Sequence, residues 1–412
     1  MITKFTIPEL DQNELQERLS NARYPNELQD DYTGWKFGSP TWAVKDMVDY
    51  WKSGFSWEKS RDEINRWHHY QTPINDLNIH FIHEPSSRPS SIPLVLLHGW
   101  PSTFYEFHKI IEPLRDHPTQ AFHVVVPSLP GYGFSEAPKK YGTGGVAAFA
   151  DVTHQLMQKL GYHKYMIYGT DWGSAIGSRL AQDHPDHVLG YFTNMMIAGP
   201  PLPTLQNIFK HPLKVLKFML SIVLGFGYIY GADFAPLANF SFANVEKYEG
   251  AAYRAIQGMR PYTLAYGLTD SPVGLLGWML EPYHVWTFHT AEEETQNIPD
   301  TITRDEFLTQ VTLYWLTNSM SSSIRIYYEA MREMGKAPKM DIRVPLGVCY
   351  FKNEAFKFPR DWIEASATKL IQFKTFSTGG HFPALEETDH LLGEIQRFGV
   401  AVSKQTQKSK DI

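Results

Sequence analysis

The chain has 412 residues, a formal net charge of −6 and a hydrophobic share of 43%. This composition is typical of a globular enzyme, and the acidic balance argues against nucleic-acid binding, which relies on clustered Lys and Arg. The length exceeds that of an average domain, so we expect two units or one decorated domain. The single cysteine, Cys349, excludes an intrachain disulfide and favours a reducing, cytoplasmic location.

The amino-terminal part of the chain, residues 1–85, is rich in tryptophan and shows few clean strands. The stretch "TWAVKDMVDYWKSGFSWEKSRDEINRW" has helical spacing, and "LNIHFIHE" alternates as a strand does. The first residues, "MITKFTIPEL", contain no apolar segment typical of a secretory signal. We therefore predict a meander that wraps the surface of a soluble protein.

Strands and helices alternate from residue 86 onward. The predicted strands are "IPLVLLHGW", "HVVVPSLPGYGFS", "YMIYG" and "VLGYFTNM", and after an interruption the pattern resumes at "VPLGVCYF" and "LIQFKTF". Such alternation predicts an α/β fold whose parallel sheet is covered by helices on both faces. We assign residues 86–197 and 341–412 to this core.

The segment between the two parts of the core, residues 198–340, is helical in pattern and rich in Tyr, Phe, Leu and Met. An insertion there predicts a helical cap over the carboxyl ends of the strands. Its most apolar stretch, Val215 to Ala232, is interrupted by Lys217 and two glycines. It therefore favours a lid helix lining an apolar pocket over a membrane span, with shallow membrane contact as an alternative.

The stretch "YMIYGTDWGSAIG" indicates a strand, a tight turn and a helix, with Gly169 and Gly173 on either side of Asp171. This pattern is typical of the nucleophile elbow of α/β-hydrolases, in which serine occupies the apex. A carboxylate at a helix amino terminus is already charged at neutral pH and needs no base to activate it. Its attack on a saturated carbon leaves an ester that water can cleave. Asp171 therefore predicts an epoxide or an alkyl halide as substrate.

Hydrolysis of such an ester requires a base for water and donors for the oxyanion. His381, in "STGGHFPALEE", follows the last predicted strand and is the expected base. The backbone amides of Trp100, in "HGWP", and of Trp172 are the expected oxyanion donors. His98 is interpreted as a structural residue of the same loop. This chemistry needs no metal and no organic cofactor.

Several motifs together resemble the microsomal-like branch of epoxide hydrolases within the α/β-hydrolase superfamily. They are the Trp-rich amino terminus, "HGWPSTFYEF", "PSLPGYGFS", "GTDWGS", "TDSPVGLLGW", "LYWLTNSMSSSIRIYYE" and "GGHFPALE". The resemblance implies hydrolysis of an epoxide to a vicinal diol through an aspartyl ester, with Asp171 as nucleophile and His381 as base. The acid that orients the histidine matches Glu354 in "YFKNEAFKFP", with Asp361 as the fallback.

The resemblance also implies that two tyrosines of the cap, Tyr253 and Tyr327, donate to the epoxide oxygen. A phenol suits this role because it can donate while staying neutral at pH 7. The main rival is a haloalkane dehalogenase, in which Trp172 and Trp100 would donate N–H groups to the halide. An epoxide-opening cyclase and a non-catalytic binding protein on the same scaffold are further alternatives. A lipophilic epoxide is the expected partner, and family likeness makes a homodimer plausible.

Overall fold

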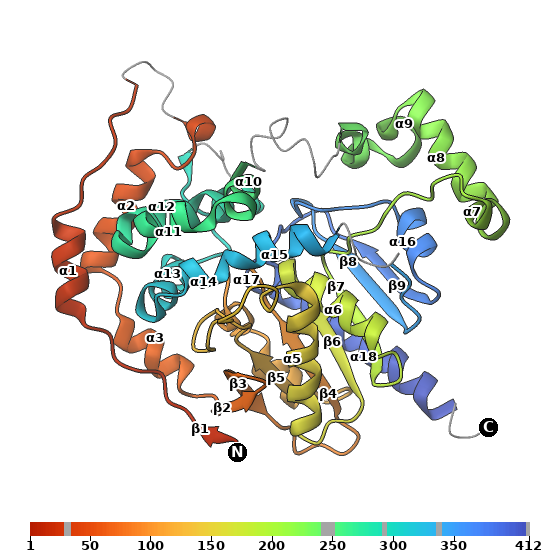
Figure 1. Cartoon of the computed structure of the whole chain (residues 1–412), viewed down its shortest axis with the longest axis horizontal. Coiled ribbons are helices and arrows are strands. Elements are labelled where there is room, and N and C mark those ends of the chain that lie inside the picture. Colours follow the sequence, from red (N-terminus) through yellow and green to blue (C-terminus); the bar gives the residue numbers. More distant parts are fainter. Residues whose placement is uncertain (29–33, 240–251, 291–294, 335–339, 409–412) are drawn as a thin grey trace.

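The computed structural model describes residues 1–28, 34–239, 252–290, 295–334 and 340–408. Its centre is a nine-stranded sheet in the order β1-β2-β3-β5-β4-β6-β7-β8-β9 (Figure 1). The strands are β1 (Thr3–Lys4), β2 (His69–Ile74), β3 (Leu77–Glu84), β4 (Ile92–Leu97), β5 (Phe122–Pro127), β6 (Tyr165–Gly169), β7 (Val188–Thr193), β8 (Leu346–Tyr350) and β9 (Leu370–Thr375). The α/β-hydrolase class predicted from the sequence is the observed architecture.

The helices fall into three groups along the chain. Those that precede β7 are α1 (Gln12–Ser20), η1 (Trp35–Phe37), α2 (Thr41–Ser53), α3 (Trp57–Ile64), η2 (Phe104–Phe107), α4 (Ile111–Asp116), α5 (Val146–Lys159) and α6 (Asp171–Asp183). Those between β7 and β8 are α7 (Leu205–Lys210), α8 (Pro212–Leu224), α9 (Phe226–Tyr230), η3 (Ala232–Asn239), α10 (Ala252–Met259), α11 (Pro261–Asp270), α12 (Pro272–Val285), α13 (Arg304–Thr317), α14 (Met320–Ser323) and α15 (Arg325–Met334). The last three are α16 (Arg360–Ser366), α17 (Pro383–Glu386) and α18 (Thr388–Lys408).

The strands β5, β4, β6, β7, β8 and β9 run parallel, and all but the edge strand β9 are buried on both faces. Side chains alternate between the faces of a strand, so Val95 and Leu97 of β4 enter one hydrophobic cluster, and Leu94 and Leu96 enter the other. This double burial explains the nearly continuous apolar run of β4 in the sequence. The sheet thereby gives the carboxyl ends of its strands a rigid base.

The sheet is mixed, whereas the alternating pattern predicted a parallel one. The strands β1, β2 and β3 add an antiparallel extension beside β5. Ile74 pairs with Leu77, so only Asn75 and Asp76 connect β2 to β3, and a two-residue turn can join only antiparallel strands. Asn75 has the positive φ of 52° that such a turn requires. The predicted boundary between an amino-terminal meander and the core at residue 86 stays a prediction. The strands β1, β2 and β3 precede that boundary but belong to the same sheet as the core strands.

The helices α13, α14 and α15 lie across the end of the sheet at which β6 leads into α6 (Figure 1). Buried hydrogen bonds join α13 to the loop after β4: the Tyr314 hydroxyl donates to the Ser102 carbonyl at 2.9 Å, and the Thr103 hydroxyl donates to Gln310 Oε1 at 2.6 Å. These contacts couple the inserted helices to the loop that carries Trp100.

The stretch from Val215 to Ala232 contains two helices, α8 and α9, because Gly225 separates them at a φ of 99°. The stretch is helical, as predicted, but it forms two helices, and its role as a lid stays a prediction. Phe218 and Phe226 pack against Trp362 of α16, at ring distances of 5.8 Å and 6.1 Å. In the described part of the chain, no helix combines the length and apolarity needed to cross a bilayer.

Candidate active site

The nucleophile elbow predicted from the sequence forms between β6 and α6. Asp171 is the first residue of α6 and has a φ of 48°, a left-handed conformation that costs energy for a residue with a side chain. A Cβ atom at Gly169 would meet the backbone of Gly173, and one at Gly173 would meet the backbone of Leu97. Both flanking positions therefore need glycine, and the turn presents the Asp171 carboxylate beyond the end of the sheet.

The two carboxylate oxygens of Asp171 have different partners. The Trp100 backbone N–H donates to Oδ1 at 2.7 Å, and Oδ2 lies 3.3 Å from His381 Nε2. Gly99 leaves room for this carboxylate, because a Cβ atom there would overlap it. The predicted oxyanion donor Trp100 thus already binds one oxygen of Asp171, and Trp172 is the second residue of α6, where a helix has free N–H groups.

His381 and Glu354 lie together, although 27 residues separate them in the sequence. His381 Nδ1 is 2.9 Å from Glu354 Oε1, and both side chains are buried. The Phe356 N–H donates to the same oxygen at 3.2 Å, and the Asn194 amide donates to Oε2 at 3.0 Å. Because both oxygens of Glu354 are hydrogen-bonded, the buried carboxylate is held in one orientation.

The electrostatics of His381 follow from these two carboxylates. Burial by itself would lower the pKa of His381, but Glu354 and Asp171 outweigh it and raise the pKa well above its ordinary value. Each ring nitrogen faces a carboxylate oxygen, and both can donate only when the imidazole is protonated. The free site therefore favours an imidazolium between two carboxylates.

The fallback acid, Asp361, lies elsewhere. It belongs to α16 and pairs with Lys217 of α8, with Oδ2 at 2.7 Å from Nζ. His98, interpreted as structural, is buried and accepts a hydrogen bond from the Leu129 N–H at 3.2 Å. Burial lowers the pKa of His98 to about 4, so it stays neutral at pH 7. Neither residue contacts the Asp171 carboxylate by a hydrogen bond or ion pair among the described residues.

Tyr253 and Tyr327 come from α10 and α15 and lie beside each other, with ring centres 5.8 Å apart. The Tyr253 ring stacks on Trp100 at 5.4 Å, and the Tyr327 ring meets the edge of Trp172 at 4.8 Å. Burial, together with the charge of Asp171, raises the pKa of both phenols. The buried Tyr327 hydroxyl has no hydrogen-bond partner within the described residues, so it is available to a ligand.

Three residues of the site were missed from the sequence. Asn194 follows β7 and orients Glu354. The Trp286 carbonyl accepts from the His381 N–H at 2.8 Å. Glu386 accepts from the N–H groups of Phe288 and Phe382 and so fixes the loop around His381. The position of Asn194 at the carboxyl end of a parallel strand was a signal that could have identified it, whereas nothing local marks Trp286.

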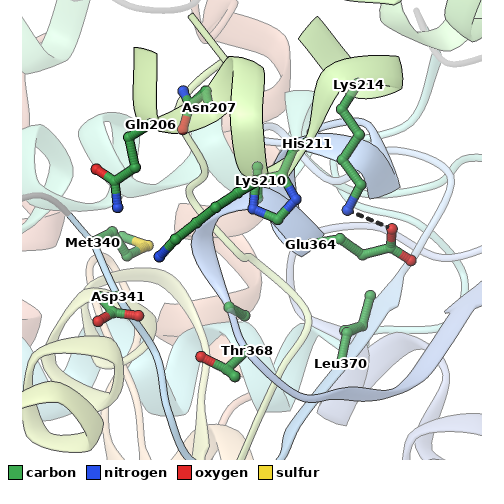
Figure 2. Close-up of a pocket in the computed structure, with 12 residues that line it drawn as sticks. Gln206, Asn207, Lys210, His211, Lys214, Met340, Asp341, Glu364, Thr368 and Leu370 are labelled. Atoms are coloured by element: carbon green, nitrogen blue, oxygen red, sulfur yellow. Dashed lines mark ion pairs between the residues drawn. The ribbon is translucent and has the colours of Figure 1, made fainter. Parts of the chain in front are cut away.

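A separate cavity of about 710 Å³ lies away from Asp171, between the helices α7 and α8 and the sheet edge at β9. Figure 2 shows Gln206, Lys210 and His211 on one side, with Asp341 and Glu364 among the residues opposite. Among the described residues, no group of three or more His, Cys, Asp or Glu side chains is arranged to hold a metal ion.

Comparison with known proteins identifies the family of this chain. A family model described as the epoxide hydrolase N terminus matches residues 2–107, and one for the α/β hydrolase fold matches residues 92–245. Epoxide hydrolase 1 of Sus scrofa is 36% identical over 406 residues, which cover 94% of this chain and 85% of that protein. The juvenile hormone epoxide hydrolase of Bombyx mori is 32% identical over 398 residues, covering 93% and 82%.

Solved structures of epoxide hydrolases also match this chain. The crystal structure of the juvenile hormone epoxide hydrolase from Bombyx mori matches with a TM-score of 0.82 and 29% identity, covering 98% of this chain and 96% of that one. The Aspergillus niger epoxide hydrolase matches with a TM-score of 0.77 and 29% identity, covering 98% and 97%. The fold and elbow define an α/β-hydrolase with aspartate at the nucleophile position. The chain belongs to the epoxide hydrolase family, as its motifs predicted.

Proposed function

We propose that this chain hydrolyses a lipophilic epoxide to a vicinal diol through an ester on Asp171. The main support for this proposal is the arrangement of the Asp171 carboxylate. Its Oδ1 accepts a hydrogen bond from the Trp100 N–H, and its Oδ2 lies 3.3 Å from His381 Nε2. Oδ1 is thus placed to become the ester carbonyl oxygen, and Oδ2 is free to attack a carbon. A haloalkane dehalogenase would use the same elbow, but the family match and the tyrosine pair favour the epoxide.

In the first step, a bond forms between Asp171 Oδ2 and an epoxide carbon, and the bond from that carbon to the ring oxygen breaks. Tyr253 and Tyr327 polarise the ring oxygen, and one phenol gives it a proton. Because burial raises the pKa of both phenols, they stay protonated at neutral pH and remain donors until charge develops on the oxygen. Solvent returns a proton to the phenolate.

The second step hydrolyses the ester. Alkylation makes Asp171 neutral and removes one of the two charges that raise the pKa of His381, so His381 loses a proton more readily once the ester exists. The neutral imidazole then takes one proton from water while the water oxygen bonds to the Asp171 carbonyl carbon. The ester bond breaks, and the departing alkoxide takes the second water proton. Glu354 orients the imidazole, and the Trp100 and Trp172 amides stabilise the oxyanion.

Intact-protein mass spectrometry after mixing with an epoxide such as styrene oxide tests this proposal. His381→Gln should accumulate an adduct equal in mass to the substrate, because the first step proceeds and the second does not. Asp171→Ala should form neither adduct nor diol. Diol production by Asp171→Ala at the wild-type rate would refute the covalent route, and bromide release from a bromoalkane without diol formation would favour the dehalogenase.

The acid is tested by a matched pair of variants. Glu354→Gln removes the carboxylate 2.9 Å from His381 and should slow ester hydrolysis by about 10²-fold or more, so that the adduct accumulates. Asp361→Asn changes the fallback acid, which pairs with Lys217 instead, and should leave turnover close to that of the wild type. The reverse result would assign the role to Asp361. The homodimer and the cytoplasmic location stay predictions from the sequence.

A further inference from the structure

The helices α7, α8 and α9 form one edge of the molecule beside α16 and expose an unusual number of large apolar side chains (Figure 1). On α8, every exposed residue after Pro212 is apolar. The exposed large residues of this surface, here called the α7–α9 face, are Leu202, Leu205, Ile208, Phe209, Leu213, Leu216, Met219, Leu220, Ile222, Val223, Leu224 and Tyr228. Contiguous exposed apolar surface of this kind marks a site of interaction.

The polar residues of the same helices point the other way. Gln206, Lys210 and Lys214 line the cavity between these helices and the sheet edge (Figure 2). A helix on the surface of a water-soluble protein normally buries its apolar stripe and exposes its polar one. Here the polar side chains face the cavity while Leu213 and Val223 face solvent, so the helices suit an apolar environment outside the molecule.

The inner side of α8 is already anchored. Phe218 packs against Trp362 at 5.8 Å, Lys214 pairs with Glu364 at 2.9 Å, and Lys217 pairs with Asp361 at 2.7 Å. Lys214 and Phe218 lie one turn apart, on the side of α8 opposite Val223. The helix α8 thus already packs against α16 through its inner side. The α7–α9 face is an outer surface of the molecule that is not needed for this packing.

The charge of this region differs from that of the whole chain. No Asp or Glu occurs from residue 187 to residue 232, although the chain carries a formal net charge of −6. The region contains Lys210, Lys214 and Lys217. Because Lys214 and Lys217 pair with Glu364 and Asp361, Lys210 is the lysine of these helices without an ion pair among the described residues. An apolar face without carboxylates of its own, with this lysine beside it, can approach anionic phospholipid headgroups without repulsion.

We propose that the α7–α9 face docks the protein onto the surface of a lipid bilayer, with its aliphatic side chains among the acyl chains. A second copy of this chain is the competing occupant, but interfaces between proteins contain roughly one hydrogen bond per 100–200 Å², and the outer face of α8 offers no polar side chain for one. Acyl chains require none. The proposal goes beyond the proposed function, and its test does not depend on epoxide hydrolysis.

Flotation with vesicles tests the docking. The full chain should float with vesicles of phosphatidylcholine and more strongly when phosphatidylglycerol is included. A triple variant, Leu213→Gln with Leu216→Gln and Val223→Gln, should bind at least about tenfold more weakly, because it removes three exposed apolar side chains from the contact. Phe37→Gln is the matched control: Phe37 is 75% exposed but lies in η1, outside the face, and its loss should not change binding.

A site-specific label tests the orientation. Cys349 is the single cysteine and is fully buried, so an introduced surface cysteine can be labelled selectively with an environment-sensitive dye. The dye on Val223→Cys should brighten and shift to the blue on addition of vesicles, and the dye on Phe37→Cys should not. Equal responses at the two positions would overturn the proposal.

The remaining outcomes are equally decisive. Failure of the wild type to float with either vesicle, or unchanged flotation of the triple variant, would overturn the proposal. A wild-type dimer in solution that the triple variant converts to monomer, without vesicle binding by either, would assign the face to a second copy. Diol formation from a water-soluble epoxide without lipid should be the same in wild type and triple variant. Its absence from both would count against the proposed function and not against the docking.

Discussion

At the scale of single residues, Trp100 contacts the phenols of Tyr253 and Tyr327 as well as the Asp171 carboxylate. Trp100 touches both tyrosine rings, with centres 5.4 Å from Tyr253 and 5.9 Å from Tyr327, while its backbone N–H binds Asp171. One residue thus positions the nucleophile through its backbone and packs against the proposed proton donors through its side chain. Phenols held in such apolar surroundings act strongly on charge that develops nearby.

Replacing the phenols tests their role. Tyr327→Phe keeps the ring against Trp172 and removes only the hydroxyl, so kcat/KM for an epoxide should fall by about 10²-fold, as for loss of one preorganised donor. Tyr253→Phe should act similarly, and the double variant should lose nearly all activity. Tyr328→Phe is the control, because Tyr328 is the next residue and its ring stacks on the Arg332 guanidinium. An equal loss of activity in Tyr328→Phe would show that Tyr327 was wrongly chosen over its neighbour as the proton donor.

At the scale of elements, the elbow shows which features local sequence can specify. Gly169 and Gly173 are needed because β6, α6 and the end of β4 pass too close for a Cβ atom, so the motif encodes the geometry directly. The glycines in the stretch from Val215 to Ala232 were seen as interruptions, but an isolated glycine in an apolar run does not reveal whether it takes a positive φ, so the break between α8 and α9 at Gly225 could not be located from the sequence.

The strain at the elbow gives a stability prediction. Asp171→Gly and Asp171→Ala both remove the carboxylate, but only alanine retains a Cβ atom at the φ of 48°. The glycine variant should therefore be more stable by about 1 kcal/mol, even though glycine also gains freedom in the unfolded chain. Urea denaturation of the two variants measures the difference. Greater stability of the alanine variant would show that the turn relaxes out of the left-handed conformation.

At the scale of the whole molecule, buried carboxyl groups make stability depend on pH. Glu106, in η2, is buried, and its Oε1 has no hydrogen-bond partner among the described residues. Burial raises the pKa of Glu106 to about 8 from an ordinary value of 4.5. The folded protein therefore holds a proton that the unfolded chain has released between these two values, so this group lowers stability as pH rises from about 4.5 to about 8.

Glu106→Gln should remove this dependence, because glutamine is neutral at every pH. Between pH 5 and pH 9, the free energy of unfolding of the wild type should fall by roughly 2–5 kcal/mol more than that of the variant. Burial also raises the pKa of Glu386, to about 7, so Glu386 too lowers the free energy of unfolding as the pH rises. This contribution is present in both the wild type and the variant, and it cancels in the difference between them. Denaturation at the two pH values gives the comparison, and parallel curves would show that Glu106 is ionised in the folded state.

The sequence by itself determined the alternation of strands and helices, the elbow around Asp171 and the inserted helical segment, because each depends on residues close together in the chain. The sequence also limited the acid that orients His381 to two candidates, Glu354 and Asp361. Only the tertiary structure placed Glu354 beside His381 and Asp361 beside Lys217, and brought Asn194 and Trp286 to the site. Contacts between distant segments depend on how the sheet and helices pack, and neither periodicity nor local propensity encodes them.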